Sequence, residues 1–213
     1  MYLLLGAICF IAFILVIRQI YLVGAITVKR DSASIVSENT YALPYSKKDP
    51  SFGNPGAPVT VAIFSDLSCK QCQSIVNEIH TFVARHPRDV RMVWFDAPKS
   101  SLFFDRKLPH KAARCALAQD AFWQYVDQIF AVSGNYKRDF LDSTAQRLKL
   151  NMDSWSTCMA LKETQEAVEA GGTLLDSFHI SSVPAIFVNN KYITLVKGLD
   201  VTAILNQVIV PTP

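Results

Sequence analysis

The amino-acid sequence predicts an α/β domain with a mixed central sheet and an all-helical insertion, preceded by an apolar helix. A strand–helix–strand pattern spans residues 59–95 and predicts two parallel strands joined by a right-handed crossover. A stretch with helical spacing follows, centred on an insertion at about residues 105–165. Two short strands and an amphipathic helix then complete the domain between residues 185 and 208. The insertion therefore falls between a βαβ half and a ββα half.

The composition is that of a globular chain. Of the 213 residues, 50% are hydrophobic, and the formal net charge is only +3. This composition excludes a disordered chain, and the small charge argues against nucleic acid as a principal ligand. The apolar residues are concentrated in residues 1–28, and the rest of the chain has an ordinary composition. We therefore expect a membrane segment joined to one domain.

Residues 1–28 are predicted to form a transmembrane anchor or signal-anchor. A cleaved signal peptide is the alternative, because Val23-Gly24-Ala25 suits cleavage, but the segment lacks a basic start. Lys29-Arg30 would favour a cytoplasmic domain by the positive-inside rule. The cysteine chemistry favours the opposite side of the membrane, and we give it more weight. Residues 29–50 are expected to form a polar tether, with the domain at residues 51–213.

Each predicted element of the domain has its own signal. The apolar runs Val59–Phe64 and Val90–Phe95 are typical of buried strands. Helical spacing between them predicts a helix from about Lys70 to Arg85 that ends before Pro87. The later elements are expected as a helix from near Pro109 to about Phe130, helices around residues 140–148 and 155–159, a helix at Lys162–Phe178, a hairpin of Ala185–Val188 and Tyr192–Val196, and a helix at Val201–Val208.

Cys69-Lys70-Gln71-Cys72 lies at the junction of the first strand and the first helix. A thiolate at a helix N-terminus is stabilised by the helix dipole and by unpaired backbone N–H groups. Cys69 is therefore predicted to be the attacking nucleophile, and Cys72, one turn along, the thiol that resolves a mixed disulfide. Half of a zinc site and a structural cysteine pair are the alternatives, although no second pair of metal ligands at the usual spacing accompanies these residues.

The other cysteines of the domain are Cys115 and Cys158, which fall in different predicted helices of the insertion. In an oxidising compartment they could form a structural disulfide, and two buried free thiols are the alternative. Val183-Pro184 stands immediately before a predicted strand, where proline sets an extended backbone. A cis peptide bond there would present a backbone edge to a bound peptide, whereas a trans bond would make it an ordinary start of a strand.

Together these residues resemble the DsbA-like thioredoxin-fold proteins, in particular their membrane-anchored branch. The resemblance covers about residues 49–209, and it implies a thioredoxin fold and thiol–disulfide exchange on exported proteins. It also implies that Val183 and Pro184 form a cis-proline loop that contacts the substrate. The motifs that carry it are Gly53–Thr60 leading into Phe64–Cys72, Leu108-Pro109-His110 with Cys115-Ala116 and Phe122-Trp123, and Val183–Val188.

The sequence departs from this family pattern close to the dithiol. Lys70 and Gln71 stand where family members often carry Pro, an aromatic residue or His, and these two positions modulate the redox poise. Ile63 occupies the place where many thioredoxin-fold enzymes have a buried acid. Asp66 is a candidate substitute, and a solvated acid at the end of a strand is the alternative interpretation. His110 matches the family pattern and is expected to be structural.

We therefore expect a single-pass membrane thiol–disulfide oxidoreductase with its domain on the periplasmic or extracellular side. The resemblance favours a dithiol oxidase that acts on cysteine-containing exported proteins and is regenerated by a membrane redox partner. The alternatives are a reductase or isomerase, and a non-enzymatic binding or metallochaperone module. No cofactor, resident metal or nucleic-acid partner is predicted.

Overall fold

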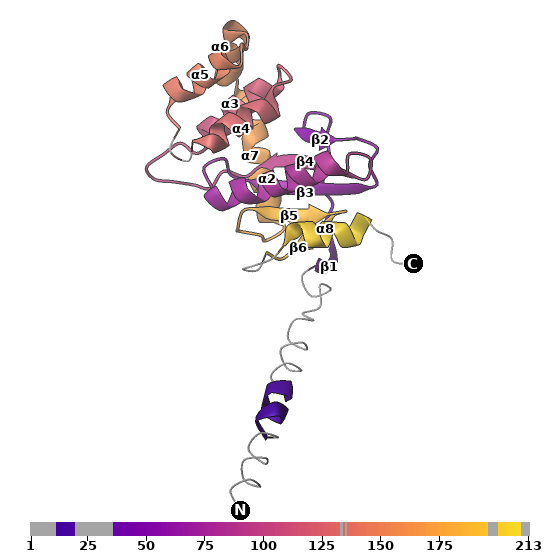
Figure 1. Ribbon diagram of the computed structural model, residues 1–213. Helices are drawn as coiled ribbons and strands as arrows, with labels where there is room; N and C mark the ends of the chain where they lie inside the picture. The colour runs from indigo at the N-terminus through magenta and orange to yellow at the C-terminus, as the bar shows by residue number, and fades with distance from the viewer. Residues whose placement is uncertain (1–11, 20–35, 133, 135, 196–199, 210–213) are drawn as a thin grey trace, which may run out of the picture. The chain divides into compact units, whose positions relative to one another are not determined.

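Strand β3 (Val59–Ser65) is the centre of the sheet, and all seven of its residues are buried. The computed structural model places it in a six-stranded mixed sheet with the order β1-β6-β5-β3-β4-β2 (Figure 1). Strand β4 (Val90–Asp96) runs parallel to β3, and β5 (Ala185–Val188) runs antiparallel to it. The parallel pair and the mixed sheet predicted from the sequence are confirmed.

The structure describes residues 12–19, 36–132, 134, 136–195 and 200–209. Residues 12–19 are helical and exposed to solvent. The rest of the predicted anchor, residues 1–11 and 20–28, lies outside the described residues. Within the described ranges, no helix is both long and apolar enough to cross a membrane. The predicted anchor therefore stays a prediction.

Helices cover both faces of the sheet (Figure 1). Helix α2 (Lys70–Arg85) buries the apolar side chains predicted for its inner face, Val76, Ile79 and Val83 among them. Helix α8 (Val201–Ile209) lies beside α2, and the Thr202 N–H donates to the Glu78 carboxylate at 3.2 Å. Helix α7 (Lys162–Ser177) covers the opposite face.

Gly171 allows α7 to approach the end of β4 closely. A Cβ atom at this position would overlap the carbonyl oxygen of Asp96 and lie 3.1 Å from its carbonyl carbon. The neighbouring Gly172 meets nothing within 4 Å. Leu175, on the same helix, packs into the core cluster with Phe64, Phe95 and Phe187.

The insertion consists of α3 (Lys107–Leu117), α4 (Phe122–Ala131), α5 (Arg138–Arg147) and α6 (Met152–Ala160). The single helix expected from Pro109 to Phe130 is wrong, because the chain breaks between α3 and α4. Asp120 has a left-handed backbone with φ of 58°, a conformation that ends a helix. A disulfide joins Cys115 on α3 to Cys158 on α6, with Cα atoms 5.7 Å apart.

Part of the predicted tether belongs to the domain. The compact unit starts at Val36, and β1 (Val36–Thr40) forms the sheet edge by pairing with β6 (Lys191–Ile193). Tyr41 then packs edge-on against Phe178 and Phe187, which explains why this polar stretch is ordered on the sheet. At the other edge, β2 (Ser51–Gly53) pairs with β4.

Candidate active site

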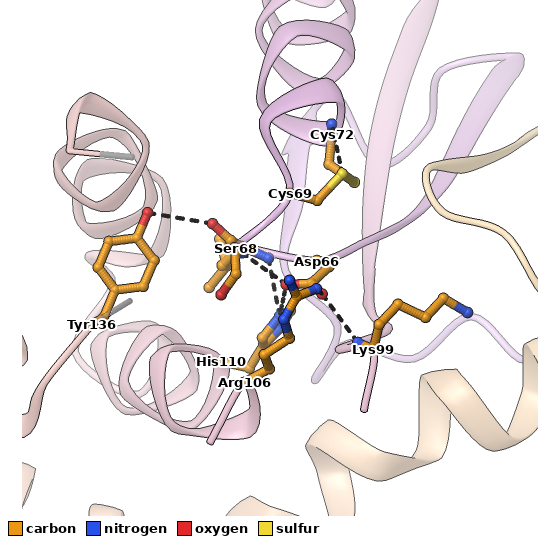
Figure 2. The surroundings of a disulfide bond; sticks show 9 residues. Asp66, Ser68, Cys69, Cys72, Lys99, Arg106, His110 and Tyr136 are labelled. Carbon is orange, nitrogen blue, oxygen red and sulfur yellow. Dashed lines mark hydrogen bonds and ion pairs between the residues drawn. A yellow bond between two sulfur atoms is a disulfide. The ribbon is translucent and has the colours of Figure 1, made fainter. Parts of the chain in front are cut away.

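The two predicted active-site cysteines lie at the start of α2. Cys69 is the N-cap residue, and its Sγ accepts the backbone N–H of Cys72 at 3.1 Å (Figure 2). The two cysteines form a disulfide with Cα atoms 5.1 Å apart. Cys69 is partly exposed, whereas Cys72 is fully buried. Access therefore favours Cys69 as the sulfur that an incoming thiolate attacks, and the backbone donor at its Sγ suits a thiolate when the pair is reduced.

Lys70 and Gln71 are exposed at the surface of the first helical turn. Their side chains are therefore available to a bound substrate. Their modulating role stays a prediction. Gln73, the residue after Cys72, connects α2 to the insertion, because its side-chain amide donates to the backbone carbonyl of Phe130 on α4.

The carboxylate of Asp66 is buried directly before the dithiol, so the alternative of a solvated acid is wrong. It accepts hydrogen bonds from the backbone of Ser68 at 2.7 Å and of Lys99 at 3.0 Å, and from the Arg106 guanidinium at 2.9 Å (Figure 2). Burial raises the pKa of Asp66, but hydrogen bonds from His110, Lys99 and Ser68 outweigh it and leave the pKa below its ordinary value.

His110 connects the loop before Cys69 to a second buried acid, Asp96. The His110 Nε2 accepts the backbone N–H of Leu67 at 3.0 Å, and its Nδ1 lies 2.6 Å from Asp96 Oδ1. Burial lowers the pKa of His110, but its hydrogen bonds with Asp66 and Asp96 outweigh burial and raise the pKa above its ordinary value. The structural role expected for His110 fits these contacts.

Asp96 is fully buried at the end of β4, where it lies opposite Ser65 of β3. Besides His110, it accepts the Trp94 indole N–H at 2.8 Å and the Arg114 guanidinium. Burial raises the pKa of Asp96, but the Arg114 charge and the His110 hydrogen bond outweigh it and lower the pKa below its usual value. The buried Asp66, Asp96 and His110 and the partly exposed Arg106 and Arg114 thus form one cluster, the acid–histidine cluster, beneath the dithiol.

Sequence reasoning missed Asp96, Arg106 and Arg114 as members of this cluster. A signal for Asp96 was present, because the carboxyl ends of two parallel strands lie side by side. An acid at the end of the second strand must therefore lie near the end of the first strand, where the Cys-x-x-Cys helix begins. The two arginines gave no such signal. They come from the start of the insertion, and only the folded chain brings them to the acids.

The Val183–Pro184 peptide bond is cis, as the resemblance implied. Pro184 is buried and directly precedes β5, in which Ala185 lies opposite Phe64 of β3. Continuing this register by one residue aligns Pro184 with Ser65, at the end of the strand that leads into the dithiol. Substrate contact by Val183 and Pro184 stays a prediction.

The fold and the dithiol geometry agree with the family model for thioredoxin, which matches residues 45–207. This chain belongs to the thioredoxin family. A Cys-x-x-Cys disulfide at the N-terminus of α2 is the site that thiol–disulfide exchange requires. Family and site together support the thiol–disulfide exchange chemistry predicted from the sequence.

Two solved structures have the same fold at low sequence identity. Oxidised BdbD from Bacillus subtilis superposes with a TM-score of 0.64 and 20% identity, covering 81% of this chain and 97% of BdbD. DsbA2 from Pseudomonas aeruginosa gives a TM-score of 0.63 and 21% identity, covering 78% of this chain and 94% of DsbA2. These similarities confirm the thioredoxin fold with its helical insertion.

A curated relative is much longer than the matched part of this chain. The Na(+)/H(+) antiporter NhaA 3 from Salinispora tropica is 26% identical over 135 residues, which are 63% of this chain. The chain spans about a fifth of the length of the curated relatives it matches, at 21% of each.

Proposed function

We propose that the protein introduces disulfide bonds into cysteine-containing exported proteins. The observation that carries this proposal is the placement of a partly exposed Cys69 at the N-cap of α2, with buried Cys72 beneath it and the cis Val183–Pro184 bond at the same sheet edge. An exposed nucleophile beside a backbone edge that can pair with a peptide is suited to a protein substrate rather than to a small thiol alone.

The reaction proceeds by two thiol–disulfide exchanges. A substrate thiolate attacks Cys69 Sγ, the Cys69–Cys72 bond breaks, and the Cys72 thiolate leaves. A second substrate thiolate then attacks the substrate sulfur of the mixed disulfide and releases the Cys69 thiolate. The substrate loses two electrons and the enzyme gains them as its dithiol. A membrane protein with a disulfide of its own must then re-oxidise the enzyme.

Equilibration of the protein with glutathione buffers tests the direction of exchange. A reduction potential near that of strong dithiol oxidants, about −120 mV, supports the oxidase, and a value near −270 mV, the range of reducing thioredoxin-type pairs, would instead assign a reductase. Replacing Cys69 by Ser should abolish exchange with any protein substrate. Replacing Cys72 by Ser removes the disulfide that a substrate thiolate attacks, so substrate oxidation should cease. In the reverse direction, the Cys69 thiolate of this variant attacks a substrate disulfide and forms a mixed disulfide that Cys72 can no longer resolve, so covalent complexes should accumulate.

The non-enzymatic alternative is tested by a metal titration. Tight stoichiometric metal binding at Cys69 and Cys72, combined with no exchange activity, would replace the proposed function by a metallochaperone role. Retained exchange by the Cys69→Ser variant would contradict the assignment of the nucleophile.

We further propose that residues 1–28 anchor the chain and that the domain lies on the periplasmic or extracellular side. The cysteines support this side, because two disulfides in one domain fit an oxidising compartment. A membrane-impermeant thiol reagent applied to intact cells after mild reduction tests it. Labelling of Cys69 in intact cells supports the orientation, whereas labelling only after lysis would reverse it.

A further inference from the structure

Three consecutive large apolar side chains are exposed in the loop between β4 and α3. Leu102 is 97% exposed, Phe103 83% and Phe104 47%. The rings of Phe103 and Phe104 are neighbours, with centroids 6.3 Å apart. Contiguous exposed apolar side chains of this kind are typical of binding surfaces. The thiol–disulfide chemistry of Cys69 and Cys72 makes no use of them.

This loop borders a cavity that lies next to a smaller hollow at the nucleophile. One cavity of about 350 Å³ is lined by Phe103, Phe104, Leu108 and Pro109, and also by Ser68 and Tyr136. A smaller hollow of about 40 Å³ shares Ser68 and Tyr136 and includes Cys69. The two hollows therefore lie side by side and share these two residues as a common wall. We call them together the insertion-side groove.

The wall of the insertion-side groove is held in place before any ligand binds. The Tyr136 hydroxyl lies 2.9 Å from the backbone carbonyl of Ile129. It also lies 3.4 Å from the backbone carbonyl of Leu67, the contact drawn as a dashed line in Figure 2. Its ring stacks on Phe140, with centroids 5.6 Å apart. Burial of the hydroxyl raises the pKa of Tyr136, so it stays a neutral donor. A preformed wall reduces the entropy that binding costs.

The groove approaches the dithiol from a different side than the cis-proline loop. Strands β5 and β4 flank β3 on its two sides. Val183–Pro184 precedes β5, whereas the loop with Phe103 follows β4. A polypeptide whose cysteine reacts at Cys69 can therefore contact both surfaces at once.

Charged side chains border the insertion-side groove beside its apolar lining. Lys70 borders the small hollow and Lys137 the large one, and neither has an ion pair in the described part of the chain. Asp105 is the one carboxylate at the described rim, and its side chain accepts the Lys107 backbone N–H at 3.0 Å. The rim therefore suits a ligand with an acidic residue beside an apolar one.

We propose that the insertion-side groove binds the polypeptide substrate beside its reacting cysteine and selects a large apolar side chain there. This proposal rests on the proposed function. Phe103 and Phe104 contact the apolar side chain, and Lys137 faces an acidic neighbour. The groove favours a polypeptide over a lipid surface, because it is concave and leads to the sulfur that must react with a cysteine.

The test compares two peptides with the full-length protein. Both carry a reactive dithiol, and they differ only in a Phe or a Ser near the first cysteine. Phe103→Ser should lower kcat/KM for the Phe peptide about tenfold, the scale that one apolar contact supplies, and leave the Ser peptide and the rate with glutathione unchanged. Leu161→Ser is the matched control, because Leu161 is also exposed, at 45%, but lies between α6 and α7.

Each outcome decides between the alternatives. An equal effect of Phe103→Ser on both peptides, or none on either, would overturn the proposal. A loss that is equal for both peptides and appears only with phosphatidylglycerol vesicles would assign the loop to a lipid surface instead. Absence of exchange by the wild-type protein, with glutathione as well as with peptides, would refute the proposed function rather than the groove.

Discussion

Removal of the Cys115–Cys158 disulfide should cost the domain about 4 kcal/mol of unfolding free energy. The bridge spans a sequence separation of 43 residues and joins α3 to α6. Closing a loop of this length in the unfolded chain removes about 13 cal/mol/K of entropy, or about 4 kcal/mol at 25 °C. With an m-value of about 2 kcal/mol/M, the urea midpoint should fall by about 2 M.

The measurement uses a background with Cys69→Ser and Cys72→Ser, so that only one disulfide responds to reductant. Unfolding is followed by the fluorescence of the buried tryptophans, with and without reductant. Reduction breaks the bond between Cys115 and Cys158 but keeps both side chains. The measured change in stability therefore comes from the lost cross-link and not from a cavity. The m-value should also rise, because an unfolded chain without the cross-link exposes more surface. A midpoint shift below about 0.5 M would refute the chain-entropy reasoning.

Three further predictions concern the packing and the charges beneath the dithiol. Gly171→Ala should lower the free energy of unfolding by about 1–3 kcal/mol, because the added Cβ overlaps the Asp96 backbone. Gly172→Ala, on the same helix with open space around it, should raise the free energy of unfolding by about 0.5–1 kcal/mol. Equal urea midpoints for the two variants would contradict the close packing at Gly171. His110→Ala should cost about 3–5 kcal/mol, because Asp96 and a backbone N–H lose a buried partner; a loss below about 1 kcal/mol would mean that water replaces the imidazole. Folding lowers the pKa of Asp66 and of Asp96. The stabilisation that these two carboxylates contribute is therefore present at neutral pH, above the unfolded carboxyl pKa, and is lost as pH falls through the lower folded values. The urea midpoint should decline below about pH 4, and it should decline less steeply in an Asp96→Asn variant.

The sheet centre and the dithiol could be predicted from the sequence because their signals are local. Val59–Phe64 is uniformly apolar, the following helix shows regular spacing, and a Cys-x-x-Cys motif at their junction has few physical interpretations. The edge strands gave no such signal. Ser51–Gly53 is only three residues long, and its pairing with β4 is set by the partner strand rather than by an apolar pattern of its own.

The acid–histidine cluster could not be predicted for a different reason. Its members come from the ends of two strands and from the first insertion helix, and each one alone is an ordinary polar residue. What makes them a unit is burial, which forces every charged group to find a partner within hydrogen-bonding distance. The break between α3 and α4 was missed because Asp120 adopts a left-handed backbone that its residue type permits but does not require.

The hydrogen bond between His110 and the loop before Cys69 limits how far this protein can be shortened. Removing residues 105–165 to leave a minimal thioredoxin domain would delete Arg106, His110 and Arg114 together. Asp66 would then keep only the backbone donors of Ser68 and Lys99, and Asp96 only the Trp94 indole, while both acids lose the cations and the imidazole that now offset their charges. An engineered minimal domain would therefore need apolar or amide residues at positions 66 and 96, so the insertion and the redox centre must be redesigned as a single unit.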